Sequence, residues 1–166
     1  MNADKRGLSC MKALGVRIIS ILIFCCLAFT GLPVVAQPTP FDLNAALAKA
    51  QPGAVIQVPA GVYAGPLQIV KPVVLEAEPG AVVDGNGQGD VVTISAAKVT
   101  LRGFVIRNSG DSLDQENAGI TVLAPQATLE NNRVENALFG IYLKNAPQSV
   151  IRNNTILPKA LPEARR

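Results

Sequence analysis

Three acidic residues close together in the chain are its strongest candidates for chemistry. Asp111, Asp114 and Glu116 lie in the polar segment from Asn108 to Gly119. Such carboxylates serve as calcium ligands, as acid–base pairs on sugars, or as contacts to a partner on an exposed loop. The segment lacks the glycine that an EF-hand calcium loop needs between its ligands. The spacing favours a solvated, turn-forming loop, with partner docking as the functional hypothesis and a metal or catalytic site as the weaker alternative.

A second polar segment, Gly85-Asn-Gly-Gln-Gly89, has the composition of a phosphate-binding loop but not its context. Such a loop needs a following helix whose first amides face the phosphate, whereas the apolar run from Val91 to Ser95 predicts a strand. Asp84 and Asp90 flank the loop at turn positions, where aspartate caps backbone amides. The sequence therefore predicts neither a phosphate site nor an acid–base pair here.

The first 36 residues have the pattern of a secretory signal peptide. Four basic residues precede an uncharged apolar run from Ile18 to Leu32, and small residues lead up to Ala36, after which we predict cleavage. A retained membrane anchor is the competing interpretation, which Pro33 argues against. Translation from Met11 instead of Met1 would give a shorter leader of the same kind. We therefore expect an exported, periplasmic protein.

Removal of the leader takes away all three cysteines and the excess of basic residues. It removes four Lys or Arg and one Asp, which leaves eleven basic and eleven acidic residues, and the chain has no histidine. A neutral chain with five aromatic residues lacks the basic surface that nucleic-acid binding requires. It also lacks a Ser–His or Cys–His nucleophile and the imidazole or thiolate that copper prefers. We expect no cofactor, no bound metal and no nucleic-acid partner.

An internal repeat defines the elements that must position the candidate residues. Leu101, Leu129 and Ile151 occupy the same place in three similar segments, 28 and 22 residues apart. A second family of apolar segments keeps nearly the same spacing, at Val91–Ile94, Gly119–Val122 and Gly140–Leu143. Units of this length cannot bury a face alone and must stack on their neighbours. The pattern predicts an all-β fold, a right-handed parallel β-helix, with about six inserted residues in the acidic segment.

Short β-rich runs, separated by Gly and Pro turns, fill most of the mature chain. The predicted strands lie within Val55–Val58, Pro66–Ile69, Val73–Ala77, Ala81–Asp84, Val91–Ser95 and Val99–Arg107. One helix is predicted from Phe41 to Ala50, with Asp42 at its N-cap, and such a short amphipathic helix suits the cap of a solenoid. We divide the mature chain into a linker and capping helix, residues 37–53, and an incomplete β-helix, residues 54–166.

Two pairs of asparagines fall at matching positions of the last two repeats. They are Asn131, Asn132, Asn153 and Asn154. Asparagine tolerates left-handed turns, and its side-chain amide can bond to the same residue of the next coil. We interpret all four as a structural ladder rather than as ligand-binding residues. Because Arg102-Gly103 stand at this place in the preceding repeat, such a ladder begins one coil later.

Several stretches carry a resemblance to a known family. They are Leu43–Gly53, Gly61–Leu67, Ala81–Gly85, Ser109–Asp114 with Ala118–Ile120, and Leu138–Leu143. Through them the mature chain resembles the NosD family, the periplasmic β-helix component of an ABC-type system that matures the copper sites of nitrous-oxide reductase. Members of that family are longer, so the resemblance implies that this chain is an N-terminal fragment whose last coil has no cap.

The resemblance implies a non-catalytic role. The partners that it implies are an ABC-transporter permease and ATPase, a copper-chaperone lipoprotein and nitrous-oxide reductase, with contact to the membrane only through these partners. Because the mature chain lacks the ligands that copper prefers, we expect a scaffold with a docking loop rather than a copper carrier. The alternative hypothesis is a polysaccharide-active β-helix enzyme or carbohydrate-binding module, for which Asp111 or Asp114 would supply the carboxylate.

Overall fold

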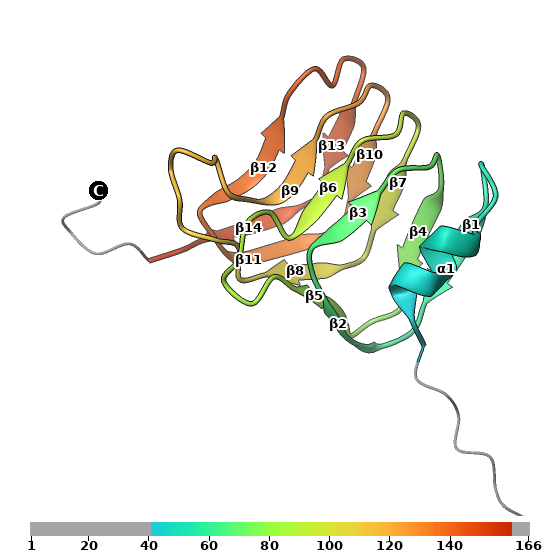
Figure 1. The fold of residues 1–166 in the computed structure, drawn as a ribbon, viewed down its shortest axis with the longest axis horizontal. Helices are drawn as coiled ribbons and strands as arrows, with labels where there is room; N and C mark the ends of the chain where they lie inside the picture. The colour runs from blue at the N-terminus through green and yellow to red at the C-terminus, as the bar shows by residue number, and fades with distance from the viewer. Residues whose placement is uncertain (1–40, 161–166) are drawn as a thin grey trace, which may run out of the picture. The chain divides into compact units, whose positions relative to one another are not determined.

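The computed structural model describes residues 41–160. These residues form a parallel β-solenoid, in which each full coil contributes one short strand to each of three parallel sheets, A, B and C (Figure 1). The predicted parallel β-helix class is confirmed.

Sheet A contains β1 (Val55–Val58), β4 (Val74–Ala77), β7 (Thr100–Arg102), β10 (Thr128–Glu130) and β13 (Val150–Arg152). Sheet B contains β2 (Gly61–Ala64), β5 (Ala81–Asp84), β8 (Val105–Arg107), β11 (Arg133–Ala137) and β14 (Thr155–Pro158). Sheet C contains β3 (Leu67–Ile69), β6 (Val92–Ile94), β9 (Ala118–Val122) and β12 (Phe139–Leu143).

The register of the sheets matches the spacing of the repeats. Leu129 lies between Leu101 and Ile151 in sheet A, and Ile120 lies between its paired residues in β6 and β12 of sheet C. Successive side chains of a strand point to opposite faces, so one residue in two faces the interior. Leu101, Leu129 and Ile120 are completely buried, and apolar residues from all three sheets form one continuous core.

The predicted strands differ from the observed ones in two places. The run from Val99 to Arg107 is divided between β7 and β8, because Gly103 has a left-handed φ of 81° and turns the chain from sheet A to sheet B. A Cβ on Gly103 would lie 3.0 Å from the carbonyl oxygen of Ala77, a tight contact that adds to the preference of this positive φ for glycine. The segment 61–64, which lies outside the predicted strands, forms β2 because β5 provides a parallel partner for it.

The predicted helix is present over a shorter range, as α1 (Leu43–Lys49). The Asp42 carboxylate accepts a hydrogen bond from the backbone N–H of Ala45 at 2.9 Å, which satisfies one of the free amides of the first turn. Leu43 and Leu47 face the solenoid and belong to its core. At the other end of the helix, the ammonium of Lys71 donates to the carbonyl oxygens of Ala48 and Ala50. Within residues 41–160, the structure contains no helix with the length and the apolar character that crossing a membrane requires.

The last coil differs from the inner coils in its exposure. Ile151 and Ile156, whose equivalents in the inner coils are completely buried, are 41% and 47% exposed. The row through Leu101, Leu129 and Ile151 therefore contains the same kind of side chain in two environments. The predicted signal peptide falls within residues 1–40, outside the residues that the structure describes.

The coils differ in length at one corner of the solenoid. Paired residues of sheet A begin successive coils at Val55, Val74, Thr100, Thr128 and Val150, so that the third coil is the longest. The additional residues of the second and third coils lie in the turns between sheets B and C. These turns are the 85–91 loop, between β5 and β6, and the acidic loop, residues 108–117, between β8 and β9.

Candidate functional site

The 85–91 loop and the acidic loop lie against each other and share backbone hydrogen bonds. The N–H of Gly87 donates to the carbonyl oxygen of Asn108 at 2.9 Å, and the N–H of Gly110 donates to that of Gly89 at 2.8 Å. A Cβ on Gly85 would lie 2.6 Å from the Asn108 oxygen, so close stacking requires a residue without a side chain. The glycines of the 85–91 loop thus support the neighbouring loop, in a place where no helix offers amides to a phosphate.

The acidic loop is held in one shape by its own polar residues. The side-chain oxygen of the buried Asn117 accepts from the N–H of Ser112 at 3.1 Å, and its backbone carbonyl accepts from the N–H of Phe139 in the next coil. At the beginning of the loop, the hydroxyl of the buried Ser109 accepts from the N–H of Leu138 at 2.9 Å. The ammonium of Lys159 donates a hydrogen bond to the carbonyl oxygen of Ser109. The loop is therefore anchored at both ends, with its tip exposed.

The three predicted docking residues are divided between two hollows. Asp111 and Asp114 border an open hollow of about 390 Å³ together with Ser112 and Leu113. Leu113, between the two acids, is 53% exposed. Glu116 lies on the other side of the loop and faces sheet C. The structure therefore brings two of the predicted carboxylates together and directs the third elsewhere.

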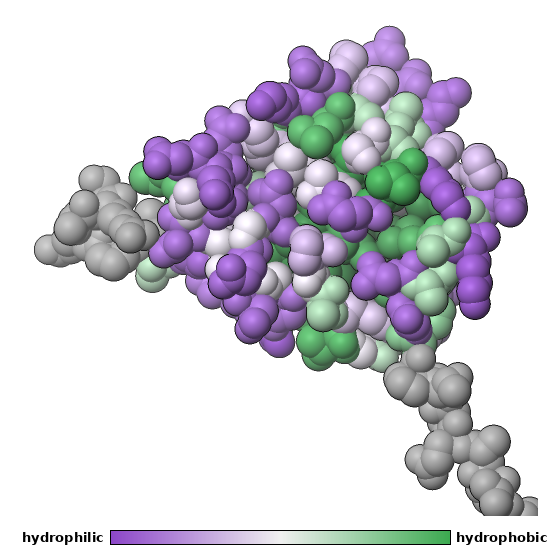
Figure 2. Space-filling model, in the orientation of Figure 1, coloured by the Kyte–Doolittle hydropathy of each residue, from purple (hydrophilic) through white to green (hydrophobic). Residues whose placement is uncertain are grey.

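Glu116 borders a second hollow, of about 180 Å³, between the acidic loop and the outer face of sheet C. Its lining consists of Asp90, Gln115, Glu116, Thr121, Leu123, Tyr142 and Lys144. We call it the sheet-C hollow. Figure 2 shows this side of the molecule, on which hydrophilic residues gather toward the acidic loop and apolar residues lie nearer the middle. The sequence analysis did not predict this hollow. Thr121 and Tyr142 stand at the same position of aligned repeats, which is the one indication in the sequence that their side chains are neighbours.

Two carboxylates of the sheet-C hollow have identifiable partners. One oxygen of Asp90 accepts from the backbone N–H of Ala118 at 2.8 Å, which is the turn-capping role that aspartate favours. The Glu116 carboxylate accepts a hydrogen bond from Tyr142, and this bond, together with burial and the charge of Glu116, raises the pKa of the Tyr142 phenol. Each carboxylate oxygen has two lone-pair positions, so these contacts leave acceptor capacity on both residues.

Asp84, which flanks the 85–91 loop on its other side, takes part in a separate network. Its carboxylate accepts from Asn108 Nδ2 at 2.8 Å, from the N–H of Asn86 at 2.9 Å and from Arg107 Nε at 2.7 Å. These partners, with the Asn108 hydrogen bond as the largest influence, lower the pKa of Asp84. Asn136 extends the series by donating to the side-chain oxygen of Asn108 at 2.8 Å. This second ladder was missed, although Asn108 and Asn136 end two of the aligned repeats.

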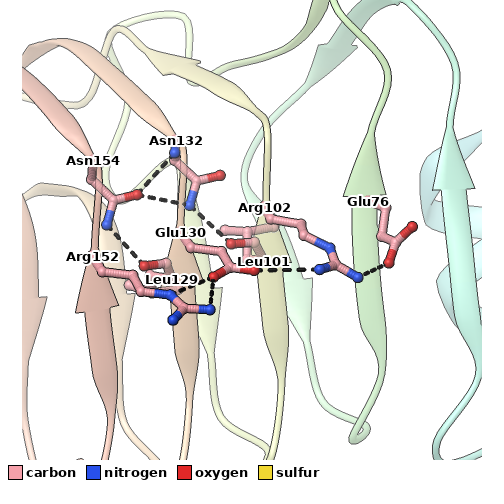
Figure 3. A network of polar contacts seen from close by, with 8 residues as sticks. All are labelled: Glu76, Leu101, Arg102, Leu129, Glu130, Asn132, Arg152 and Asn154. Carbon is pink, nitrogen blue, oxygen red and sulfur yellow. Dashed lines mark hydrogen bonds and ion pairs between the residues drawn. The ribbon is translucent and has the colours of Figure 1, made fainter.

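In each asparagine pair of the turn between sheets A and B, the first residue forms the turn and the second bonds to the neighbouring coil. Asn131 and Asn153 adopt left-handed φ angles of 55° and 56°, as the turn requires. Asn132 and Asn154 point along the stack, and Asn132 Nδ2 donates to the carbonyl oxygen of Leu101 at 2.9 Å (Figure 3). Asn154 repeats this bond one coil later, to Leu129, and its side-chain oxygen accepts from the N–H of Asn132. These contacts use the side-chain amides for bonds between neighbouring coils of the stack.

A row of charges runs beside this ladder on the outer face of sheet A. The paired positions Glu76, Arg102, Glu130 and Arg152 alternate in sign, and each is in contact with the next (Figure 3). The hydrogen bond from Arg152, supported by that from Arg102, lowers the pKa of Glu130. Within residues 41–160, no three His, Cys, Asp or Glu side chains are grouped so that they could hold a metal ion.

Comparisons with known proteins agree with the family resemblance. The model of a family described as "Protein of unknown function (DUF1565)" matches residues 36–160. Two curated proteins named "Probable ABC transporter binding protein NosD" are similar to the chain. The protein of Stutzerimonas stutzeri is 32% identical over 102 residues, and that of Pseudomonas aeruginosa is 34% identical over 99 residues. The matches cover 60% and 58% of this chain, but 23% of each relative, so the chain corresponds to about a quarter of their length. The predicted resemblance to NosD is confirmed.

Among solved structures, the fold is similar to a pectin methylesterase from Yersinia enterocolitica. The two share 17% sequence identity with a TM-score of 0.49, and the match covers 70% of this chain and 54% of the enzyme.

Proposed function

The chain belongs to the DUF1565 family, and from this membership and its similarity to NosD we propose that it is an extracytoplasmic binding protein of an ABC transporter. The similarity to two proteins that bear this name carries the proposal. Its finer part is that the chain acts without catalysis, as a scaffold in the maturation of the copper sites of nitrous-oxide reductase. The transporter permease and ATPase, a copper-chaperone lipoprotein and the reductase would be its partners.

The acidic loop is the surface that we propose for docking. It is the longest turn between strands of the described stack, and loops on rigid scaffolds commonly supply binding residues. The hydrogen bonds of Ser109 and Asn117 hold it in one conformation. A loop that is already ordered loses little conformational entropy when it binds, which favours affinity.

The chemistry of the tip suits a basic partner surface with an apolar centre. Exposed Leu113 stands between the carboxylates of Asp111 and Asp114. An apolar anchor that becomes buried contributes most to such an interface, while the charges around it guide the approach and select the partner. This arrangement supports docking through Leu113, with the two acids setting the orientation.

The test uses the full chain, expressed with its leader in a bacterium that makes the ABC transporter and nitrous-oxide reductase. A photo-crosslinking amino acid at position 115, next to the tip, should capture the permease when the rest of the chain is unaltered. The double variant L113S/D114K, with the crosslinker at the same position, should lose this capture. V62S with the crosslinker at position 115 is the matched control, since Val62 is an apolar residue on sheet B, 66% exposed and outside the loop.

The outcomes separate the parts of the proposal. Absence of any transporter subunit from the crosslinked products of the unaltered chain would overturn the transporter role. Equal capture by L113S/D114K and V62S would overturn docking through this loop. For the finer part, copper content of the reductase should fall in a strain that lacks the chain and recover with V62S but not with L113S/D114K. Full copper loading without the chain would contradict the maturation role.

A further inference from the structure

All three sheets end together at the last coil. β13 is the edge strand of sheet A, β14 of sheet B and β12 of sheet C, and Figure 1 shows these strands at the end of the stack opposite α1. An edge strand presents backbone N–H and C=O groups with which no neighbouring strand pairs. We call the open side of β13 and β14 the end face. Within residues 41–160, no further strand covers it.

The end face exposes side chains of the kind that fill the interior of the solenoid. Ile151 continues the row of Leu129, and Ile156 continues the row of Val134. The inner residues of both rows are completely buried, whereas the two isoleucines are exposed. Each coil of a solenoid buries its apolar residues against the coils on both sides. The two strands therefore present an apolar surface that one more coil would cover.

The charge row of sheet A indicates which charge would continue the stack. In an inner coil, Arg102 contacts two carboxylates, that of Glu76 on one side and that of Glu130 on the other. Arg152, at the end of the row, contacts only Glu130 among residues 41–160, and its side chain is 62% exposed (Figure 3). An acidic residue stacked on Arg152 would give it the second carboxylate that Arg102 has.

The asparagine ladder indicates a second feature of the next coil. Asn132 donates to the carbonyl oxygen of Leu101, and Asn154 donates to that of Leu129. The carbonyl of Ile151 is the next in this series, since Ile151 pairs with Leu129. An asparagine in a turn above Asn154 would repeat the same hydrogen bond. The end face thus specifies an apolar residue, an acidic residue and an asparagine at successive places of its occupant.

The charge of the last coil favours an acidic occupant over a second copy of the chain. Residues 136–160 include three basic residues, Lys144, Arg152 and Lys159, and no acidic one. Two end faces brought together would place like charges near each other, which opposes association. A segment with a carboxylate over Arg152 is attracted instead.

We propose that the end face binds one further solenoid coil supplied by another polypeptide, as a short strand over β13, an asparagine turn and a second short strand over β14. The occupant carries apolar residues over Ile151 and Ile156 and an acidic residue over Arg152. Main-chain hydrogen bonds to the edge strands supply affinity, and the side-chain pattern supplies specificity. This site uses none of the residues at the tip of the acidic loop and does not depend on the transporter role.

The chain itself contains a segment with the required pattern. Residues 127–137 place Glu130 in register with Arg152, and they place apolar residues in register with both isoleucines of the end face. A synthetic peptide of this sequence with a fluorescent label is the probe. In anisotropy titrations we expect it to bind the purified full chain in a saturable manner. NMR of the isotope-labelled chain should show that the peptide shifts amide signals of β13 and β14.

Two altered peptides of equal net charge separate stacking on Arg152 from general attraction. Glu130→Lys in the peptide places a lysine over Arg152 and should weaken binding about three- to tenfold, because an attraction becomes a repulsion. Glu135→Lys in the peptide changes the charge equally but lies over Leu157, so it should weaken binding clearly less.

Arg152→Gln in the chain tests the same contact from the other side. This variant should bind the unaltered peptide more weakly, and it should remove most of the difference between the two altered peptides. Arg133→Gln is the matched control, since Arg133 is also an exposed arginine but lies one coil inward, on β11. Thermal unfolding shows whether either variant has lost its fold. The comparison of the peptides on the unaltered chain requires neither variant.

Three results would overturn the proposal. The first is the absence of saturable binding of the unaltered peptide. The second is an equal affinity of the chain for the Glu130→Lys and Glu135→Lys peptides. The third is a dimer of the chain, seen by sedimentation, that excess peptide leaves intact and Ile156→Ser dissociates, since a second copy would then occupy the end face. None of these results bears on the capture of transporter subunits by the acidic loop.

Discussion

The outer faces of sheets A and C use polar residues in opposite ways. On sheet A, Arg102 lies between Glu76 and Glu130, and the amides of the adjoining turn bond from coil to coil. On sheet C, the equivalent row passes from Thr93 to Thr121 to Tyr142, and the middle hydroxyl has no partner. One face satisfies its polar groups within the stack, whereas the other keeps hydrogen-bonding capacity beside a hollow.

The difference follows from the lengths of the turns. The turn from sheet A to sheet B contains two residues in each of the last three coils, so equivalent side chains lie above one another and form ladders. The turn from sheet B to sheet C changes from the 85–91 loop to the acidic loop and then to the single residue Leu138. Apart from the ladder of Asp84, Asn108 and Asn136 at the beginning of these turns, the side chains at that corner have no equivalents to pair with, and they become available for other contacts. Regular stacking thus provides stability, and irregular turns provide candidate sites.

The largest effect is expected in the core that both faces share. Leu129→Ala should lower the free energy of unfolding by about 2–5 kcal/mol, because it removes a completely buried side chain and leaves a cavity. Ile151→Ala, at the paired position of the exposed last coil, should cost clearly less. Urea unfolding followed by circular dichroism measures both values. Equal losses would show that the last coil is covered in solution.

A smaller loss is expected in the amide ladder beside sheet A. Asn132→Ala should lower the free energy of unfolding by about 1–3 kcal/mol, because it takes the side-chain partners from the carbonyl of Leu101 and the N–H of Phe104. Asn131→Gly is the control, since glycine accepts the left-handed turn and Asn131 is exposed. The same urea unfolding compares them, and a loss in the control as large as in Asn132→Ala would contradict the ladder's role.

The charge row of sheet A should make stability depend on pH. The pKa of Glu130 is lowered in the folded chain, so its contribution is complete above the ordinary value of 4.5 and is lost as the pH falls through the folded-state pKa. The pKa of Asp84 is also lowered, from an ordinary value of 3.8, and adds a loss of the same sign at lower pH. Unfolding measured from pH 7 to pH 3 should therefore show a fall that is shallower in Glu130→Gln. An identical pH profile in that variant would refute this role of Glu130.

At the tip of the acidic loop we expect almost no effect on stability. L113S/D114K replaces exposed side chains that make no core contact, so the free energy of unfolding should change by less than about 0.5 kcal/mol. Thermal unfolding checks this value. A larger loss would mean that the tip supports the fold, and the crosslinking result for this variant would then need a gentler substitution such as Leu113→Ala.

The smallest effect, or a slight gain, is expected in the sheet-C hollow. Thr121→Val exchanges an unpartnered hydroxyl for a methyl group, which should leave the free energy of unfolding unchanged or raise it by a few tenths of a kcal/mol. The two variants can be compared directly, since both remove a buried polar group. The free energy of unfolding should fall in Asn132→Ala but not in Thr121→Val. A loss above about 1 kcal/mol in Thr121→Val would show that the hydroxyl is bonded in the free protein.

Much of the stack was predictable because equivalent residues recur at fixed places. The pairing of Leu101 with Leu129 and Ile151 follows from the repeat, since apolar side chains of each coil must face the same interior. The helix followed from Asp42 and the apolar spacing behind it. The second ladder, through Asn108 and Asn136, has the same kind of signal in the sequence, because these two asparagines end two of the aligned repeats.

The candidate sites were only partly predictable. Asp111 and Asp114 are close in the chain, so their common hollow was foreseeable, but Glu116 turns to the other side because Asn117 closes the loop onto Ser112. Asp90, Thr121 and Lys144 lie on different coils. No spacing along the chain indicates that they meet, because the meeting depends on the path of the acidic loop over sheet C.

The amino-acid sequence by itself determined the type of fold, the pairing of the repeats and the position of the inserted loop, since each depends on apolar periodicity and on residues that favour turns. The tertiary structure alone decided which polar groups acquire partners. Hydrogen bonding requires contact within about 3 Å, and such contact depends on how neighbouring coils of unequal length stack. For this reason Asn132 lies within a ladder, whereas Thr121 keeps its hydroxyl free beneath the acidic loop.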